Sequence, residues 1–189
     1  MAALPGGAPR TPDISVGPVD LAARIDEALA VQALAFGLSD DEVEVRRHIV
    51  DRHLLQPGAC ALGALSGNGR LVGFVYGMPN DRTHWWSTVV EPYLRRGDSD
   101  GWLDDSFVIT ELHVHPAFQG QGIGRELITT ITDRALQPRS ILSAIDIESP
   151  ARALYRSLGY RDLARQVLFP SAPSPYAVMG APLPLLRGN

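Results

Sequence analysis

The chain has 189 residues, of which 45% are hydrophobic, and a formal net charge of -4. This size supports one globular domain with a sizeable core, and the absence of a basic run argues against nucleic-acid binding. All 17 basic residues are arginines, so a phosphate-binding P-loop lysine and a Schiff-base lysine are both excluded.

Residues 1–12 are rich in proline and glycine and lack the charged start and apolar core of a signal peptide. We expect a flexible tail there, followed by a single domain over residues 13–189. No window approaches the roughly 18 consecutive apolar residues of a membrane helix, and the single Cys60 cannot form an internal disulfide. A cytoplasmic protein without membrane contacts is expected. Arginine in place of lysine, with abundant alanine, glycine and proline, is typical of a GC-rich bacterial genome.

The periodicity of apolar residues predicts a mixed sheet with helices on both faces, an α/β fold. Asp20 and Ser39 could cap the first two helices. The dipeptide Asn68-Gly69 is typical of a tight hairpin turn. In chain order we expect a strand at 13–19, helices at 20–36 and 39–55, strands at 60–65, 71–77 and 107–114, a helix at 122–136, a strand at 140–147, a helix at 150–158, and strands at 165–169 and 176–183.

Residues 78–106 form a long polar and aromatic connection that contains all three tryptophans. Trp85 and Trp86 together with Glu91 could receive a cationic amine through cation-π and charge contacts. The same residues also fit an insertion that packs on the core and has a solvated acidic rim. As a segment, 78–106 is the expected substrate-side insertion.

The stretch HPAFQGQGIGREL places Gly120, Gly122 and Gly124 between an apolar strand and a helix. Amides at the start of a helix have no partners within it and lie at the positive end of its dipole, so bare backbone there can hold a phosphate. The glycines could also serve only a tight turn. The Rossmann fingerprint is excluded, because its third glycine would fall on Arg125 or Leu127.

Val114, Pro116, Gln119, Gly122 and Gly124 form the pattern V-x-P-x-x-Q-x-x-G-x-G, which resembles the acyl-CoA signature of the GNAT superfamily of N-acetyltransferases. Downstream, PARALYRSLGY is similar to the family's short helix after its fifth strand, with Leu154, Tyr155, Gly159 and Tyr160 at its motif positions. The resemblance covers most of the chain.

The resemblance implies a mostly antiparallel sheet with an acyl-CoA cleft between the fourth and fifth strands. It also implies acetyl-CoA as co-substrate, a primary amine of a small molecule or peptide as acceptor, and no metal. The implied cofactor-binding residues are Leu112, His113 and Val114, through their backbone, and Gln119, Gly120, Gln121, Gly122, Ile123, Gly124 and Arg125. Glu148 departs from the family, because many members carry an asparagine there and a carboxylate cannot donate as an amide does.

Glu111, His113 and His115 should share one face of their strand, because side chains alternate along a strand. Some members of the GNAT superfamily place an acidic residue near this point of the strand, so the resemblance implies Glu111 as the general base, directly or through water. His113 is an alternative base, and pairing of Glu111 with an arginine or the histidines is an equally good explanation. A metal site on these three residues is geometrically feasible, although no further ligand cluster is evident.

Tyr155 matches the family's proton donor, which predicts direct transfer to the amine. A covalent route through Cys60 is disfavoured, because no His-bearing motif lies beside it. The alternative function is a catalytically silent acyl-CoA-binding module, against which the presence of Tyr155 argues. The late strands and the apolar YAVMGAPLPLL segment could pair in a homodimer.

Overall fold

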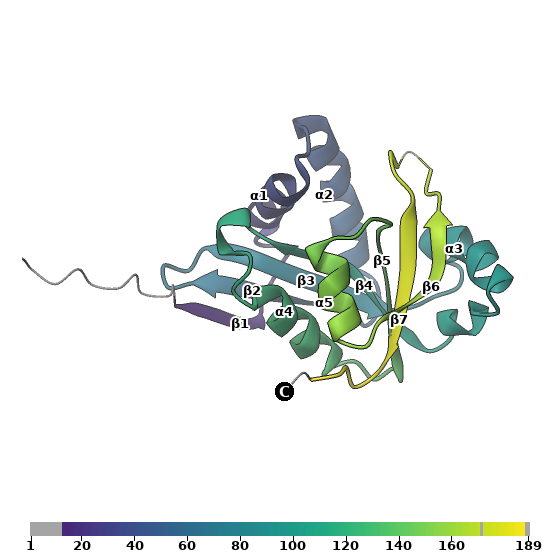
Figure 1. The fold of residues 1–189 in the computed structure, drawn as a ribbon. Coiled ribbons are helices and arrows are strands. Elements are labelled where there is room, and N and C mark those ends of the chain that lie inside the picture. Colours follow the sequence, from purple (N-terminus) through teal and green to yellow (C-terminus); the bar gives the residue numbers. More distant parts are fainter. Residues whose placement is uncertain (1–12, 171, 188–189) are drawn as a thin grey trace, which may run out of the picture.

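The computed structural model describes residues 13–170 and 172–187, and its strands form one sheet in the order β1-β2-β3-β4-β5-β7-β6 (Figure 1). All neighbouring strands are antiparallel except β4 and β5. The strands are β1 (Ile14–Pro18), β2 (Cys60–Ser66), β3 (Leu71–Pro79), β4 (Ser106–Val114), β5 (Arg139–Ile145), β6 (Arg161–Val167) and β7 (Tyr176–Pro182). The predicted tail over residues 1–12 lies outside the described residues.

Helices cover both faces of the sheet, as predicted. Buried residues of α4 and α5 join one hydrophobic cluster with β2, β4 and β7. On the opposite face of the sheet, α1 and α2 pack against β3, and α3 packs against β5, β6 and β7. The helices are α1 (Ile25–Phe36), α2 (Asp40–Leu54), α3 (Trp85–Arg96), α4 (Ile123–Thr132) and α5 (Pro150–Ser157), with short 3-10 turns η1 (Asp100–Leu103) and η2 (Pro116–Phe118).

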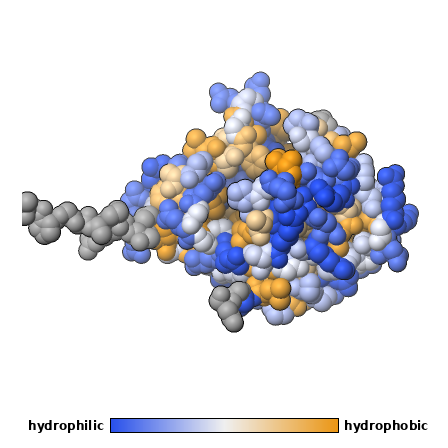
Figure 2. All heavy atoms as spheres, in the orientation of Figure 1, coloured by the Kyte–Doolittle hydropathy of each residue, from blue (hydrophilic) through white to orange (hydrophobic). Residues whose placement is uncertain are grey.

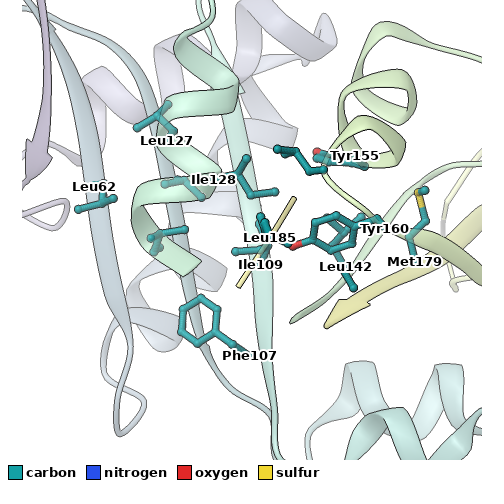
Figure 3. Close-up of a cluster of buried hydrophobic side chains, with 14 of the residues drawn as sticks. Leu62, Phe107, Ile109, Leu127, Ile128, Leu142, Tyr155, Tyr160, Met179 and Leu185 are labelled. Atoms are coloured by element: carbon teal, nitrogen blue, oxygen red, sulfur yellow. The ribbon is translucent and has the colours of Figure 1, made fainter. Parts of the chain in front are cut away.

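The core under α4 fixes the start of that helix against the sheet. Leu127, Ile128 and Ile131 are fully buried, and Figure 3 shows the first two facing side chains of β2 and β4. Burial of each such side chain contributes roughly 1.5–3 kcal/mol. The outer surface seen in the same orientation is mostly hydrophilic, with scattered apolar patches (Figure 2), as expected of amphipathic helices that bury one stripe.

Strands β4 and β5 pair over only part of their length. The register runs from Ser106–Arg139 to Ile109–Leu142 and then stops. Beyond that point β4 continues beside β3, and β5 beside β7. Within the described residues, the edge of β4 that faces β5 has no registered strand partner from Thr110 to Val114. We call this opening the strand split; it lies between the fourth and fifth strands, as the resemblance predicts.

Several predicted boundaries were wrong for local reasons. The helix α1 begins at Ile25 and not at residue 20, because Asp20 caps a preceding turn by accepting a bond from the Ala23 amide at 3.0 Å. The helix α4 ends at Thr132 and not at residue 136, and Leu136 is 95% exposed. The edge strand β6 starts at Arg161 rather than 165, since its exposed, charged start resembles a loop in sequence.

The predicted connection over residues 78–106 contains a helix, α3, and the short turn η1, neither of which was predicted from the sequence. Pro92 lies inside α3 although proline is unfavourable in a helix interior. The edges of β7 are not available for the predicted homodimer, because β7 lies between β5 and β6 and both of its edges are paired; the homodimer itself stays a prediction. The outer edge on that side of the sheet belongs to β6.

Candidate functional site

A β-bulge at Thr110 sets the direction of the polar side chains on β4. The register passes from Tyr76–Glu111 to Gly77–Ile109, which leaves Thr110 without an opposite residue. Before the bulge Ile109 faces the α4 and α5 cluster, and after it Leu112 faces the same cluster. The extra residue therefore turns Glu111 toward the face covered by α1 and α2.

Glu111 lies at the centre of a polar cluster on that face. Its Oε2 is 2.6 Å from Nε2 of His113, and its Oε1 accepts a bond from Nη1 of Arg46 at 3.2 Å. Opposite Glu111 on β3, the Tyr76 hydroxyl lies 3.1 Å from Nδ1 of His53. We refer to Arg46, His53, Tyr76, Glu111 and His113 as the Glu111 cluster. The alternative expectation that Glu111 pairs with an arginine and a histidine is thus confirmed.

The electrostatics of the cluster keep Glu111 ionised. Burial would raise the pKa of Glu111, but the hydrogen bond from His113 and the charges of His113, Arg46 and His53 outweigh burial and lower the pKa below its usual value. Burial also lowers the pKa of His53 and, together with the charge of Glu111, raises the pKa of Tyr76. Glu111 is therefore an anion held by surrounding donors.

The ring of His113 is fixed by packing. It is 5% exposed and lies 5.1 Å from the Phe36 ring and 5.3 Å from the Phe74 ring, centre to centre. His115, predicted to share this face, turns away: its Nδ1 accepts the Ala117 amide at 3.1 Å at the start of η2. The grouping of Glu111 with His113 is confirmed, whereas His115 bonds within the start of η2 and makes no hydrogen bond to Glu111 among the described residues.

Three residues of the cluster were missed from the sequence. Arg46 and His53 lie seven residues apart on α2, two helical turns, so they share a side of the helix. That spacing is a usable signal only once α2 is known to lie over β3 and β4. Tyr76 belongs to a continuous apolar run and no motif marks it.

Tyr155 lies on the other side of the strand split, in the cluster of α4 and α5 (Figure 3). Its ring is 5.8 Å from that of Tyr160, whose hydroxyl donates to Ser140 at 2.7 Å. No hydrogen bond of the Tyr155 hydroxyl is found in the part of the chain that is described. Burial, with the negative charge of Glu111, raises the pKa of Tyr155 to about 12, so its phenol stays protonated. Tyr155 and Glu111 thus approach the split from opposite faces.

The glycine loop follows β4 and opens α4. Gly120 and Gly122 have φ angles of 76° and 84°, a left-handed conformation that glycine adopts without strain. Gly122 is the N-cap of α4, no side chain caps the helix, and an added Cβ there would meet no atom within 4 Å. Gln119 closes the loop by donating to the Val114 carbonyl at 2.9 Å. The amides of Ile123, Gly124 and Arg125 form the first turn of α4 and have no partner within the helix.

A pocket of about 340 Å³ opens beside this loop, between α4 and the C-terminal segment. Gly122, Arg125, Leu158 and Arg187 are among its lining residues. Arg125 donates to the Ser157 hydroxyl at 2.7 Å, which ties α4 to α5. The pocket is therefore lined by both cationic and acidic side chains, since Glu126 and Asp133 lie on it as well.

Glu148, which departs from the family pattern, is bound to Arg156 through two hydrogen bonds of 2.6 and 2.9 Å. Its carboxylate is 73% exposed. Glu148 therefore contributes to the surface of α5 through an ion pair instead of offering an amide donor.

The residues predicted to bind substrate lie on α3 and have different surroundings. Trp85 is 59% exposed near Phe169, whereas the Trp86 indole donates to the Ser143 hydroxyl at 3.1 Å and packs in a hydrophobic cluster. Glu91 forms ion pairs with Arg82 and Arg95 at 3.0 and 2.7 Å. The alternative expectation of core packing holds for Trp86, and Glu91 is already compensated by two cations.

Other predicted chemistry finds less support in this geometry. Cys60 is half-buried on β2, and burial raises the pKa of its thiol, which disfavours the nucleophilic thiolate. Among residues 13–170 and 172–187, no group of three or more His, Cys, Asp and Glu side chains could hold a metal ion. In the same ranges, no helix is long and apolar enough to cross a membrane.

Comparison with known proteins places the site in a family. Residues 27–160 match the Acetyltransferase (GNAT) family, a span that includes the Glu111 cluster, the glycine loop and Tyr155. The chain is 25% identical over 201 residues to the GCN5-like protein acetyltransferase Rv2170 of Mycobacterium tuberculosis, covering 91% of this chain and 98% of that protein.

Solved structures of the same fold include two of similar size. The ribosomal-protein-S18-alanine N-acetyltransferase of Escherichia coli superposes with a TM-score of 0.64 at 16% identity, covering 94% of this chain and 98% of the other. A chain of the NatC complex bound to Gag peptide and CoA gives a TM-score of 0.60 at 18% identity, covering 90% and 99%. At these identities the likeness concerns the fold.

Proposed function

Because the chain belongs to the GNAT family of acetyltransferases and is therefore an acyltransferase, we propose that it transfers an acetyl group from acetyl-CoA to a primary amine of a small molecule or peptide by direct attack. The observation that carries this proposal is the position of Glu111 and Tyr155 on opposite faces of the strand split. A proton acceptor and a proton donor thereby flank one opening in the sheet.

The residues around the split fit acetyl-CoA. The free edge of β4 at Leu112 to Val114 can pair with an amide-bearing pantetheine arm as an added strand would. Bare amides from Gly120 to Arg125 can bind the diphosphate at the positive end of α4. CoA is also the ligand of the NatC complex, which shares this fold. When bound, acetyl-CoA supplies an activated thioester carbonyl.

Glu111 would accept the proton of the attacking amine. An ammonium cannot attack a carbonyl until it loses a proton, and an ionised carboxylate fixed by His113 and Arg46 is a defined acceptor for it. The lowered pKa of Glu111 makes it a weak base, so water or His53 would take the proton onward. His113 acts as a positioning residue, because its ring nitrogen is engaged with Glu111 and its ring is enclosed by Phe36 and Phe74.

Tyr155 would donate its phenolic proton toward the departing sulfur. Its raised pKa of about 12 keeps the hydroxyl protonated over the whole range of ordinary assays. Since that hydroxyl has no partner among the described residues, it is available to a bound group. The side chain is 8% exposed, and this burial strengthens a hydrogen bond to developing negative charge.

The proposal is tested by a screen of amines with acetyl-CoA, measuring release of the CoA thiol and confirming the acetylated product by mass spectrometry. The expected result is thiol release that requires both an amine and Glu111, with Glu111→Gln as the inactive comparison. Thiol release at equal rates with and without amine would contradict amine transfer. A burst of thiol before any amine is added would contradict direct attack.

A further inference from the structure

The charge balance around Glu111 points to a class of acceptor, an inference that rests on the proposed function. Glu111 is the carboxylate of its cluster, and a fixed cation, Arg46, already contacts it at 3.2 Å. His113 contacts the same carboxylate and His53 lies near it. His84 in turn is close enough to His53 to lower the pKa of His53. The Glu111 anion is thus set against Arg46 and several imidazoles, with Arg52 also near His53.

Two acidic side chains in the segment around α3 are paired with arginines. Glu91 on α3 pairs with Arg82 and Arg95, and Asp104 pairs with Arg82 at 2.6 Å. The negative charge of this segment, which could favour an acceptor with several cationic groups such as a polyamine, is therefore partly neutralised.

Arg46 has donors to spare. Guanidinium carries five N–H donors, and the one hydrogen bond recorded for Arg46 within the described residues is that from Nη1 to Glu111. Its side chain is 33% exposed and lies 6.0 Å from the ring centre of Phe36, which is itself 46% exposed. The remaining donors have the planar fork that binds a carboxylate through two parallel bonds.

We propose that the acceptor is an amine with a carboxylate a few bonds away, such as an α- or β-amino acid. The ammonium of the acceptor lies on Glu111, and its carboxylate binds the free donors of Arg46. Each charge of the acceptor thus meets the opposite charge of the Arg46–Glu111 ion pair. The ammonium gives up one proton through Glu111 to water, and the neutral amine attacks the thioester carbonyl of acetyl-CoA. The C–N bond forms as the C–S bond breaks, the departing thiolate takes the proton of Tyr155, and the second proton of the amine restores the phenol. The carboxylate of the acceptor stays unchanged on Arg46. Arg46 is the residue that determines specificity.

The test compares matched acceptors that differ only in the carboxylate, with L-alanine against L-alaninamide and L-phenylalanine against L-phenylalaninamide. The measured quantity is the ratio of kcat/KM for acid over amide, in wild type and in Arg46→Gln. Any effect of the substitution on Glu111 acts on both acceptors and cancels in this comparison. We expect wild type to favour the acids and Arg46→Gln to lower the ratio by roughly 10- to 100-fold, as for loss of a charge-assisted bond pair.

Arg47→Gln is the matched control. Arg47 is the next residue of α2, but it is bound to Asp26 and Glu44, so its substitution should leave the ratio unchanged. Wild-type preference for the amides, an unchanged ratio in Arg46→Gln, or transfer confined to spermidine or a lysine peptide would overturn the assignment to Arg46 while leaving acetyl transfer in place. Failure of acetyl-CoA to bind, with no thiol release for any amine, would overturn both proposals.

Discussion

Gly122 offers a direct test of phosphate binding at the start of α4. Its φ of 84° and the open space around its Cβ position mean that a side chain can be added without a clash but with backbone strain. Left-handed strain costs roughly 1–2 kcal/mol for an ordinary residue and less for Asn or Asp. Because Asn and Asp have the same shape, Gly122→Asn and Gly122→Asp differ only in charge.

The magnitude follows from Coulomb's law. Two unit charges about 5 Å apart, in surroundings with an effective dielectric of about 20, repel by roughly 3 kcal/mol, which is over 100-fold in Kd. The diphosphate of acetyl-CoA carries more than one charge, which increases the repulsion, whereas solvent and salt around the exposed Gly122 reduce it. Gly122→Asn should weaken binding by much less, since it only crowds the amides.

The assay is calorimetric titration of acetyl-CoA into each folded variant at low salt, since screening weakens the repulsion. Gly69→Asp is the matched control, because Gly69 has a φ of 80° and an open Cβ position but lies in the β2–β3 turn. It should keep wild-type affinity. If Gly122→Asp binds acetyl-CoA within about threefold of Gly122→Asn, the diphosphate is not bound at this loop and the reasoning is refuted.

Three further predictions concern the reaction and the fold. Tyr155→Phe should lower kcat by roughly 10²- to 10⁴-fold and leave acetyl-CoA affinity nearly unchanged. The control Tyr160→Phe should not lower kcat comparably. Equal turnover of Tyr155→Phe and wild type would remove Tyr155 as the proton donor. Because the pKa of Glu111 lies below its ordinary 4.5, its ionised form persists as pH falls from 7 to 5. Titration of the Glu111 carboxyl near pH 7, followed by carbon NMR of the wild-type protein, would contradict this. Burial would raise the pKa of Asp146, but its bonds to Arg165 and Gln166 lower that pKa to about 2. At pH values above 3.8, the ordinary pKa, Asp146 should therefore stabilise the fold, and this stabilisation should be lost as pH falls toward 2. Asp146→Asn should therefore cost about 3 kcal/mol in urea unfolding at pH 7, since it also leaves the buried Arg152 with one partner fewer; a cost as small as that of Asp133→Asn, an exposed pair with Arg187, would refute it.

Local sequence signals predicted most of the sheet and the glycine loop. Ser39 with Glu42 forms the capping box that starts α2, and Gly69 makes the hairpin turn, because both depend on residues close together in the chain. The alternation that groups Glu111 with His113 was also readable. Alternation alone cannot show which face of the sheet Glu111 and His113 lie on, because the bulge at Thr110 shifts the alternation of β4 by one residue.

The rest of the site depends on tertiary packing. Arg46 comes within hydrogen-bond distance of Glu111 across 65 positions of sequence, through the packing of α2 over β3, which no local pattern encodes. The helix α3 was not predicted, and it keeps Pro92 in its interior while Val90 and Leu94 are buried against the sheet. Such features follow from the core and not from the propensity of a segment.

The central claim is that this chain binds and uses acetyl-CoA, and calorimetric titration of the purified wild-type protein tests it most directly. Acetyl-CoA is titrated first, with NAD and ATP as controls that carry a diphosphate or triphosphate but no pantetheine. The account predicts saturable binding of acetyl-CoA and much weaker binding of both controls. A folded protein that binds NAD or ATP as tightly, or that does not bind acetyl-CoA, would contradict it.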